Sequence, residues 1–184
     1  LYRIVRGIDF TDYIMPCQTF AVRARRHGTH NFTSMDIAEV AGKAVIESFL
    51  SSSGKKLLVN LTNPDVIVRV HVTGNILIVG MDTTGDESLH RRGYRLYQHP
   101  APLKPTISYA LVRFSEWKPE QSLLDPMCGS GTIPIEAARY ACNIPAGYTR
   151  KHPYAFLKLK PFSPEEFARF RQKADEEITQ KDLS

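Results

Sequence analysis

The first half of the chain has the hydrophobic pattern of a small α/β unit. Between Gln18 and Arg26 apolar side chains recur at every second position with arginines between them, which predicts a half-buried strand. From Thr33 the apolar spacing becomes helical, and Asp36 three residues later is typical of a capping box. Three more strands are predicted at residues 57–61, 66–73 and 76–81. The last of these is apolar on both faces, so we expect it at the centre of the sheet.

The sequence from residue 83 onward predicts mainly helices joined by irregular segments. Residues 83–104 show no period and resemble a linker that carries a basic cluster. Helices are predicted from Pro105, from Thr132 and after Ser163, with a short apolar strand from Ser122 to Asp125. The expected buried stripe of the last helix consists of Phe167, Phe170, Ala174 and Ile178.

Composition narrows the class of protein only modestly. No apolar run approaches the roughly 20 residues that span a bilayer, and the first residues lack the long apolar stretch of a signal peptide. The chain does not begin with Met, so we expect it to start inside a longer protein. Three dispersed cysteines favour reduced thiols in a cytoplasmic protein over a disulfide framework or a metal site. The net charge of +5 permits a nucleic-acid partner without requiring one.

A glycine-rich loop between the predicted strand and a helix is the strongest chemical signal. Residues 125–136 read Asp-Pro-Met-Cys-Gly-Ser-Gly-Thr-Ile-Pro-Ile-Glu. A phosphate loop would need a lysine before Thr132, and a dinucleotide loop would need glycine in place of Pro134. S-adenosylmethionine fits better, because Asp125 can meet its ammonium group while the glycines admit its methionine portion. An isolated Gly-x-Gly would more often be a plain turn without a ligand.

The complete twelve-residue string resembles the cofactor loop of RNA guanine methyltransferases. Further strings resemble the same enzymes in the expected order: residues 20–37 and 63–66, residues 82–85 followed by 89–95, and the helix at 104–112. The earlier of these are similar to the THUMP domain, an RNA-binding module. The resemblance covers about residues 18–140.

The resemblance implies an α/β fold in which a THUMP domain precedes the first part of a Rossmann-like class I methyltransferase domain. We expect residues 1–17 to be the tail of an N-terminal ferredoxin-like accessory domain, residues 18–99 to be the THUMP domain with its basic linker, and residues 100–184 to begin the methyltransferase domain. The implied cofactor is S-adenosyl-L-methionine. Its expected contacts are Asp125, Pro126, Cys128, Gly129, Ser130, Gly131 and Thr132.

The implied partner is RNA, most of all tRNA near its acceptor end, where the family methylates the exocyclic N2 of a guanine. Candidate RNA-binding residues form two clusters, namely Arg23, Arg25, Arg26, His27 and His30, and Arg91, Arg92, Tyr94 and Arg95. Arginine binds phosphates in a bidentate manner, and the tyrosine could stack on an unpaired base. Alternatively, these arginines form surface ion pairs with acids such as Asp86 and Glu87.

One departure from the family bears on activity. Complete enzymes carry an Asn/Asp-Pro-Pro-aromatic loop that holds the flipped base, and residues 1–184 contain no such string. No catalytic residue can therefore be named, and we expect this chain alone to be inactive and to bind the cofactor weakly or not at all. A ribosomal RNA methyltransferase of the same build, and a THUMP module without catalysis, remain alternatives. A thiouridine-forming enzyme fits less well, because the loop is wrong for an ATP-consuming synthetase.

Overall fold

The computed structural model describes residues 1–95 and 101–180, which form two compact units. The first unit comprises residues 1–85 and 154–163, and the second comprises residues 86–153 and 164–184. The expected boundary between residues 99 and 100 lies outside the described residues. The chain therefore leaves the first unit, returns to it for one short segment, and leaves it again.

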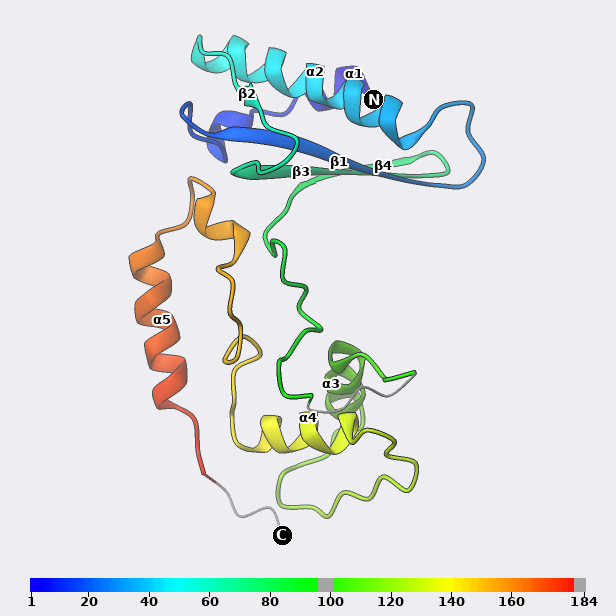
Figure 1. Ribbon diagram of the computed structural model, residues 1–184, viewed down its shortest axis with the longest axis vertical. Coiled ribbons are helices and arrows are strands. Elements are labelled where there is room, and N and C mark those ends of the chain that lie inside the picture. The colour runs from blue at the N-terminus through cyan, green and yellow to red at the C-terminus, as the bar shows by residue number, and fades with distance from the viewer. Residues whose placement is uncertain (96–100, 181–184) are drawn as a thin grey trace. The chain divides into compact units, whose positions relative to one another are not determined.

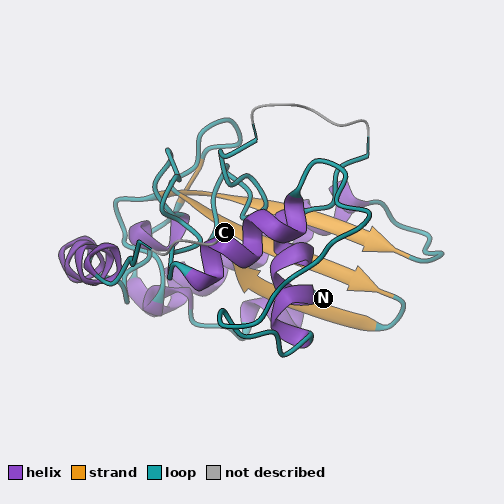
Figure 2. Ribbon diagram, turned by 90° about the horizontal axis from the view of Figure 1, so that it is seen from below, coloured by secondary structure: helices purple, strands orange, loops and turns teal. Residues whose placement is uncertain are grey.

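The first unit is a four-stranded sheet with helices on one face (Figure 1). Its elements are α1 (Tyr2–Arg6), the 3-10 helix η1 (Phe10–Asp12), β1 (Thr19–His27), α2 (Ser34–Ser53), β2 (Leu58–Val59), β3 (Val66–Thr73) and β4 (Ile76–Met81). The sheet order is β2-β1-β3-β4; β1 runs parallel to β2 and β3, while β4 is antiparallel to β3. Figure 2 shows the long strands of this sheet side by side in orange.

The position of β4 differs from the sequence prediction, because β4 is an edge strand and not a central one. The tight turn at Gly74 places β4 next to β3, whose other side is already occupied by β1. Alternate side chains of β4 are consequently solvent-exposed, and Ile76 and Ile78 remain 64% and 58% accessible. The sequence of β4 resembles that of a buried strand although the strand lies at the edge of the sheet, which is why the prediction is wrong.

Helix α2 begins at the predicted capping box. The Thr33 hydroxyl accepts the Asp36 amide at 3.2 Å, and the Asp36 carboxylate accepts the Thr33 amide at 2.7 Å. The amide and then the hydroxyl of Thr33 hold the pKa of the Asp36 carboxyl below its ordinary value. The helix ends at Gly54, whose φ of 68° is the left-handed conformation that glycine adopts without strain.

The core of the first unit extends beyond the segment 18–82. Val5, Phe10 and Ile14 are at most 1% exposed and belong to the same cluster as the apolar faces of α2, β1 and β3. Residues 1–17 therefore pack inside this unit, together with the segment 18–82. These short apolar turns carry no periodic signal from which the packing could have been predicted.

A later segment, residues 154–163, completes the same core. It contains η2 (Ala155–Lys158), and Leu159 is only 3% exposed within the core cluster. The buried Gln18 side chain donates to the Lys158 carbonyl oxygen at 2.7 Å, and the Phe156 amide donates to the Thr83 carbonyl oxygen at 3.1 Å. Residues from beyond position 150 are therefore part of the first unit's structure.

The second unit contains α3 (Pro105–Phe114), α4 (Thr132–Ala141) and α5 (Pro164–Glu176). Helices α3 and α4 pack together. Residues 122–125 lie in an extended loop and form no strand with any described residue, because no neighbouring strand is present to pair with them. Helix α5 has no buried residue, so the expected buried stripe is wrong; Phe170 is 68% exposed.

Candidate functional site

The glycine-rich loop forms two turns that lead directly into α4. The Asp125 Oδ1 atom accepts the Met127 amide at 3.1 Å, and the Gly131 amide donates to the Cys128 carbonyl oxygen at 2.8 Å. Gly129 and Gly131 have φ values of 55° and 73°, which other residues adopt only with strain. A Cβ atom at Gly129 would meet nothing within 4 Å, so its backbone faces open space.

The N-terminus of α4 has no side-chain cap. Gly131 is the N-cap residue, and Pro134 supplies no N–H group, so the amides of Thr132 and Ile133 are the donors at this helix end. These amides carry the positive end of the helix dipole. The loop thus combines an acceptor at Asp125 with donors at the helix start, a set that suits an amino-acid moiety with one ammonium and one carboxylate.

The first basic cluster follows one face of β1. In the β1–β3 register Arg23 lies opposite Arg69, Arg25 opposite His71, and His27 opposite Thr73. Arg25 and His27 are exposed, and Arg23 donates to the Leu61 carbonyl oxygen at 2.5 Å. Because α2 packs on the opposite face, which carries Val22 and the other strand residues of the core cluster, this ladder lies on the side of the sheet away from the helices.

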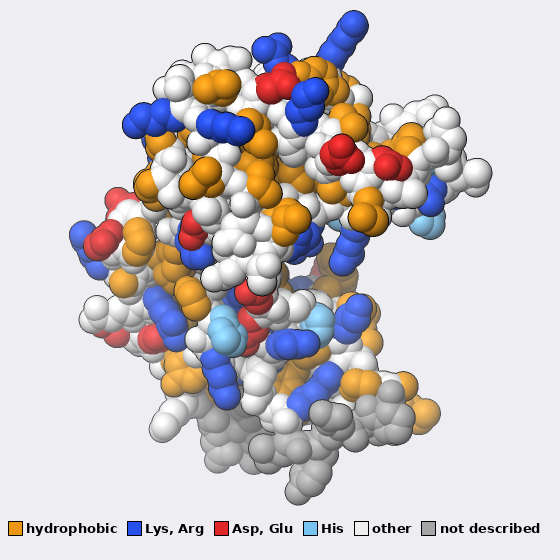
Figure 3. All heavy atoms as spheres, turned by 45° about the horizontal axis from the view of Figure 1, so that its top comes forward, with side chains coloured by type: hydrophobic (Ala, Val, Ile, Leu, Met, Phe, Trp, Pro, Cys, Tyr) orange, Lys and Arg blue, Asp and Glu red, His pale blue; other side chains and the backbone are white. Residues whose placement is uncertain are grey.

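Sequence reasoning missed the contribution of β3 to this surface. The alternation along β3 identifies Arg69 and His71 only as the polar side of a strand. Which strands pair does not follow from the pattern of either strand alone. The surface of the helix layer is different, since basic, acidic and apolar side chains are intermixed there (Figure 3, upper part). We call the side chains Arg23, Arg25, His27, Arg69 and His71 the basic sheet face.

Asp82 anchors one end of this surface. Its carboxylate is 7% exposed and accepts the Arg69 guanidinium at 2.5 Å as well as the amides of Thr84 and Gly85. Burial alone would raise the pKa of the Asp82 carboxyl, but the Gly85 amide and the Arg69 guanidinium outweigh it, and the net pKa is lowered. The charge of Arg69 is thus partly balanced within the protein.

The remaining residues of the first cluster lie around the turn after β1. Arg26 points to the other face of the sheet from Arg25 and donates to the Gly28 carbonyl oxygen at 3.1 Å. The His30 ring contacts the Gly74 carbonyl oxygen through Nε2 at 3.0 Å and lies 4.8 Å from the Phe32 ring. These two side chains help to shape the turn, and only part of their surface is available to a ligand.

The second basic cluster is not a uniform exposed patch. Arg91 is exposed, whereas Arg92 is 7% exposed and pairs with Glu136 of α4 at 3.5 Å. Arg95 donates to Thr132 Oγ1 at 3.1 Å and to the Leu103 carbonyl oxygen. The Arg139 guanidinium lies over the Tyr94 ring, 5.7 Å from its centroid. Three of the four candidate residues thus contact other parts of the second unit, to which they belong, and only Arg91 is fully exposed.

The alternative of surface ion pairs with neighbouring acids is not what the structure shows either. The Glu87 carboxylate accepts the backbone amides of Lys151 and His152 at 3.0 and 2.9 Å. These amides, that of His152 first, lower the pKa of the Glu87 carboxyl. The acid that pairs with this cluster is Glu136, 44 residues after Arg92.

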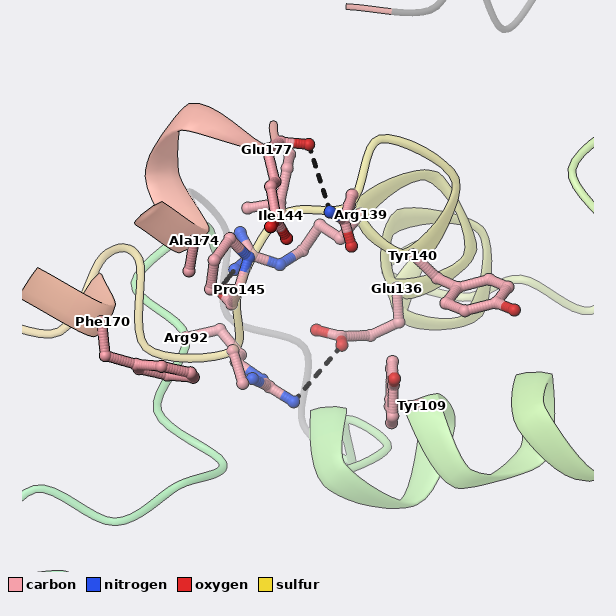
Figure 4. A pocket seen from close by; sticks show the side chains of 12 residues that line it. Arg92, Tyr109, Glu136, Arg139, Tyr140, Ile144, Pro145, Phe170, Ala174 and Glu177 are labelled. Carbon is pink, nitrogen blue, oxygen red and sulfur yellow. Dashed lines mark hydrogen bonds and ion pairs between the residues drawn. The ribbon is translucent and has the colours of Figure 1, made fainter. Parts of the chain in front are cut away.

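A cavity of about 330 Å³ adjoins the buried Arg92–Glu136 pair. In Figure 4 the two side chains point toward one another, with Tyr109 and Phe170 among the surrounding residues. Burial, and secondarily the Glu136 carboxylate, raises the pKa of the Tyr94 hydroxyl. Burial lowers the pKa of Arg139. Glu136 is the last residue of the string 125–136, and the string itself does not predict that Arg92 is its partner.

Among residues 1–95 and 101–180 no group of His, Cys, Asp and Glu side chains is arranged to hold a metal ion. No helix in the same ranges is long and apolar enough to cross a membrane.

Comparison with known proteins agrees with this geometry. The THUMP domain family matches residues 1–82, and the family described as "RMKL-like, methyltransferase domain" matches residues 92–183. The chain is 53% identical over 90% of its length to tRNA (guanine(6)-N2)-methyltransferase of Methanocaldococcus jannaschii, covering 43% of that relative. It is 38% identical over 95% of its length to ribosomal RNA large subunit methyltransferase K/L of Aliivibrio salmonicida, covering 24% of that protein.

A solved structure supports the same assignment. It is a protein described as a methyltransferase in complex with SAH, with a TM-score of 0.79 and 28% identity, and the match covers 98% of this chain and 47% of that one. This chain therefore spans less than half the length of these known proteins. On these matches, the chain belongs to the RMKL-like methyltransferase family, with a THUMP domain preceding its methyltransferase domain.

Proposed function

We propose that this chain is the RNA-binding and cofactor-loop portion of an S-adenosylmethionine-dependent tRNA guanine-N2 methyltransferase that works in the cytoplasm. We propose tRNA as the substrate because the chain is 53% identical to a tRNA (guanine(6)-N2)-methyltransferase across 90% of its length. The loop supports the choice of cofactor, since the acceptor Asp125 and an uncapped helix start flank two glycines with positive φ. The cofactor would supply an electrophilic methyl group to the guanine amine.

The cofactor contacts that we propose are the loop residues. Asp125 would accept the ammonium group, and the helix-start amides would meet the carboxylate of the methionine portion. Gly129 and Gly131 allow the ligand to approach the backbone closely. The remaining expected contacts, Pro126, Cys128, Ser130 and Thr132, shape the loop between these groups.

The RNA contacts that we propose lie first on the basic sheet face. Its arginines and histidines line two adjacent strands, so they can follow a phosphate backbone. Arg26 and His30 at the turn after β1 would add contacts next to this face. The exposed Arg91 would add a separate contact from the second unit. In this proposal the THUMP unit binds the 3′ single-stranded end of the tRNA and so determines which base reaches the methyltransferase domain.

Methyl transfer to defined transcripts tests the substrate. The full-length protein is incubated with radiolabelled S-adenosylmethionine and a tRNA transcript, and the methylated guanine is mapped. Inosine at that position lacks the 2-amino group, so transfer should disappear if N2 is the acceptor. Continued transfer to the inosine transcript would refute N2 methylation. Transfer to a large-subunit ribosomal RNA fragment in preference to tRNA would favour the function named for the Aliivibrio salmonicida relative.

A binding measurement tests the role of the tRNA end. Filter binding of tRNA with and without its 3′ single-stranded nucleotides should show weaker binding of the trimmed tRNA. Equal affinities would contradict recognition of that end.

Residues 1–184 contain no Asn/Asp-Pro-Pro-aromatic string, so we propose that this stretch alone does not transfer methyl groups. Robust turnover by the isolated 184-residue chain would refute that.

A further inference from the structure

Two arginines of the second basic cluster contact α4, the helix that follows the glycine-rich loop. Arg95 donates to the hydroxyl of Thr132, the first residue of α4. Arg92 pairs with Glu136, which lies about one turn further along the helix. Both contacts therefore fall on the part of α4 nearest to Gly129 and Gly131.

Thr132 is the point at which three segments meet. Its side chain is 3% exposed, and its hydroxyl also lies 3.3 Å from the Ser130 hydroxyl within the loop. Its carbonyl oxygen accepts the hydroxyl of Ser108, a fully buried residue of α3, at 3.0 Å. A chain of polar contacts thus runs from Arg95 through Thr132 to Ser130. Displacement of the arginine would be transmitted to the loop by these contacts.

The Arg92–Glu136 pair is buried to a degree that is unusual for charged residues. The two side chains are 7% and 2% exposed, and removing two charges from water is costly unless they are well paired. The Nε atom of Arg92 and the Oε1 atom of Glu136 have no hydrogen-bond partner in the described structure. The attraction between the two charges is therefore largely offset by the cost of burying them, and the pair adds little to the stability of the fold. A role in fixing one arrangement of α4 accounts for it better than stability does.

We propose that Arg92 and Arg95 are positioning residues of the cofactor loop and do not bind RNA. They hold the first turns of α4, and with it the backbone of Gly129–Gly131, in the conformation that receives the cofactor. The identity of the ligand rests on the proposed function, whereas the attachment of the loop does not. Arg91, between His90 and Arg92, is exposed and lies outside this set of contacts.

Binding measurements on the full-length protein separate the two roles. In Arg92→Ala and Arg95→Ala the dissociation constant for S-adenosylhomocysteine, measured by calorimetry, should rise about tenfold or more, because each loses a charge-assisted contact. Their affinity for tRNA should stay within about twofold of wild type. The matched control Arg91→Ala should leave cofactor affinity unchanged. Unchanged cofactor affinity with weakened tRNA binding in Arg92→Ala and Arg95→Ala would overturn the proposal.

Two further readouts distinguish positioning from a general loss of structure. Arg95→Lys keeps a positively charged donor group and should recover part of the cofactor affinity. The double variant Arg92→Glu with Glu136→Arg should bind S-adenosylhomocysteine more tightly than either single variant. Without ligand, amide hydrogen exchange at residues 128–136 should quicken in Arg95→Ala, while exchange in β1 and β3 should not. Unchanged exchange in the loop would overturn the proposal. If wild type itself fails to bind S-adenosylhomocysteine, the proposed function fails, and the exchange measurement still decides the loop attachment.

Discussion

Arg23 and Arg69 are register partners on the adjacent parallel strands β1 and β3, on the same face of the sheet. Arg69 is neutralised by Asp82 at 2.5 Å, whereas Arg23 donates to a neutral carbonyl oxygen, that of Leu61. The charge of Arg23 is therefore left for a phosphate group of a ligand. This difference between the two arginines is the physical reason for proposing RNA binding on this face.

Arg23→Ala and Arg25→Ala should each weaken tRNA binding several-fold and lower the steepness of its salt dependence by about one unit of the logarithmic slope, because each removes one phosphate contact. Filter binding at several salt concentrations measures both quantities. Arg3→Ala is the matched control, because Arg3 is an exposed arginine of α1 in the helix layer. Equal losses in all three variants would mean that only net charge matters and that the basic sheet face is not the binding surface.

Asp82→Asn should lower the free energy of unfolding by about 1–3 kcal/mol at neutral pH, because a buried carboxylate then no longer balances Arg69. The folded pKa of Asp82 is lowered from 3.8, so its contribution is present above that pH and is lost as the pH falls through the folded value. Urea unfolding between pH 7 and about pH 2 should show the wild type converging on the variant in acid. A constant difference across the range would contradict this assignment.

Leu159→Ala should destabilise the first unit by about 2–5 kcal/mol, because Leu159 fills its core from a distant part of the sequence. Denaturant unfolding followed by a probe in the first unit measures the loss. Leu61→Ala is the control, since Leu61 is 66% exposed and its truncation should change stability by less than about 0.5 kcal/mol. Similar small effects in both variants would show that the returning segment does not contribute to this core.

Thr33→Ala should cost about 1 kcal/mol of stability, since it removes the hydroxyl that caps α2. Thr33→Ser keeps the hydroxyl and should stay within a few tenths of a kcal/mol of wild type. Thermal or urea unfolding compares the three proteins. A serine variant as unstable as the alanine variant would show that the methyl group of Thr33, and not its cap, is what matters.

Local features were predictable from the sequence, whereas contacts between distant segments were not. The structure has three local features where expected, namely the capping box at Thr33, the short connection between the strands 66–73 and 76–81, and the loop before Thr132. Each of them depends on neighbouring residues. The edge position of β4 and the burial of Arg92 depend on which segments pair, and no local pattern encodes that choice. A basic residue in an aperiodic stretch looks the same whether it faces solvent or a buried glutamate.

The path of the chain between the two units has a consequence for biosynthesis. Ribosomes make a protein from its N-terminus, but the first unit needs residues 154–163, which are synthesised after most of the second unit. The sheet and α2 can form early, yet their core stays open near Gln18 until Leu159 has left the ribosome. The first unit therefore cannot complete its core before the glycine-rich loop at residues 125–136 has been made. The two units of the nascent chain thus finish folding at a similar stage of synthesis.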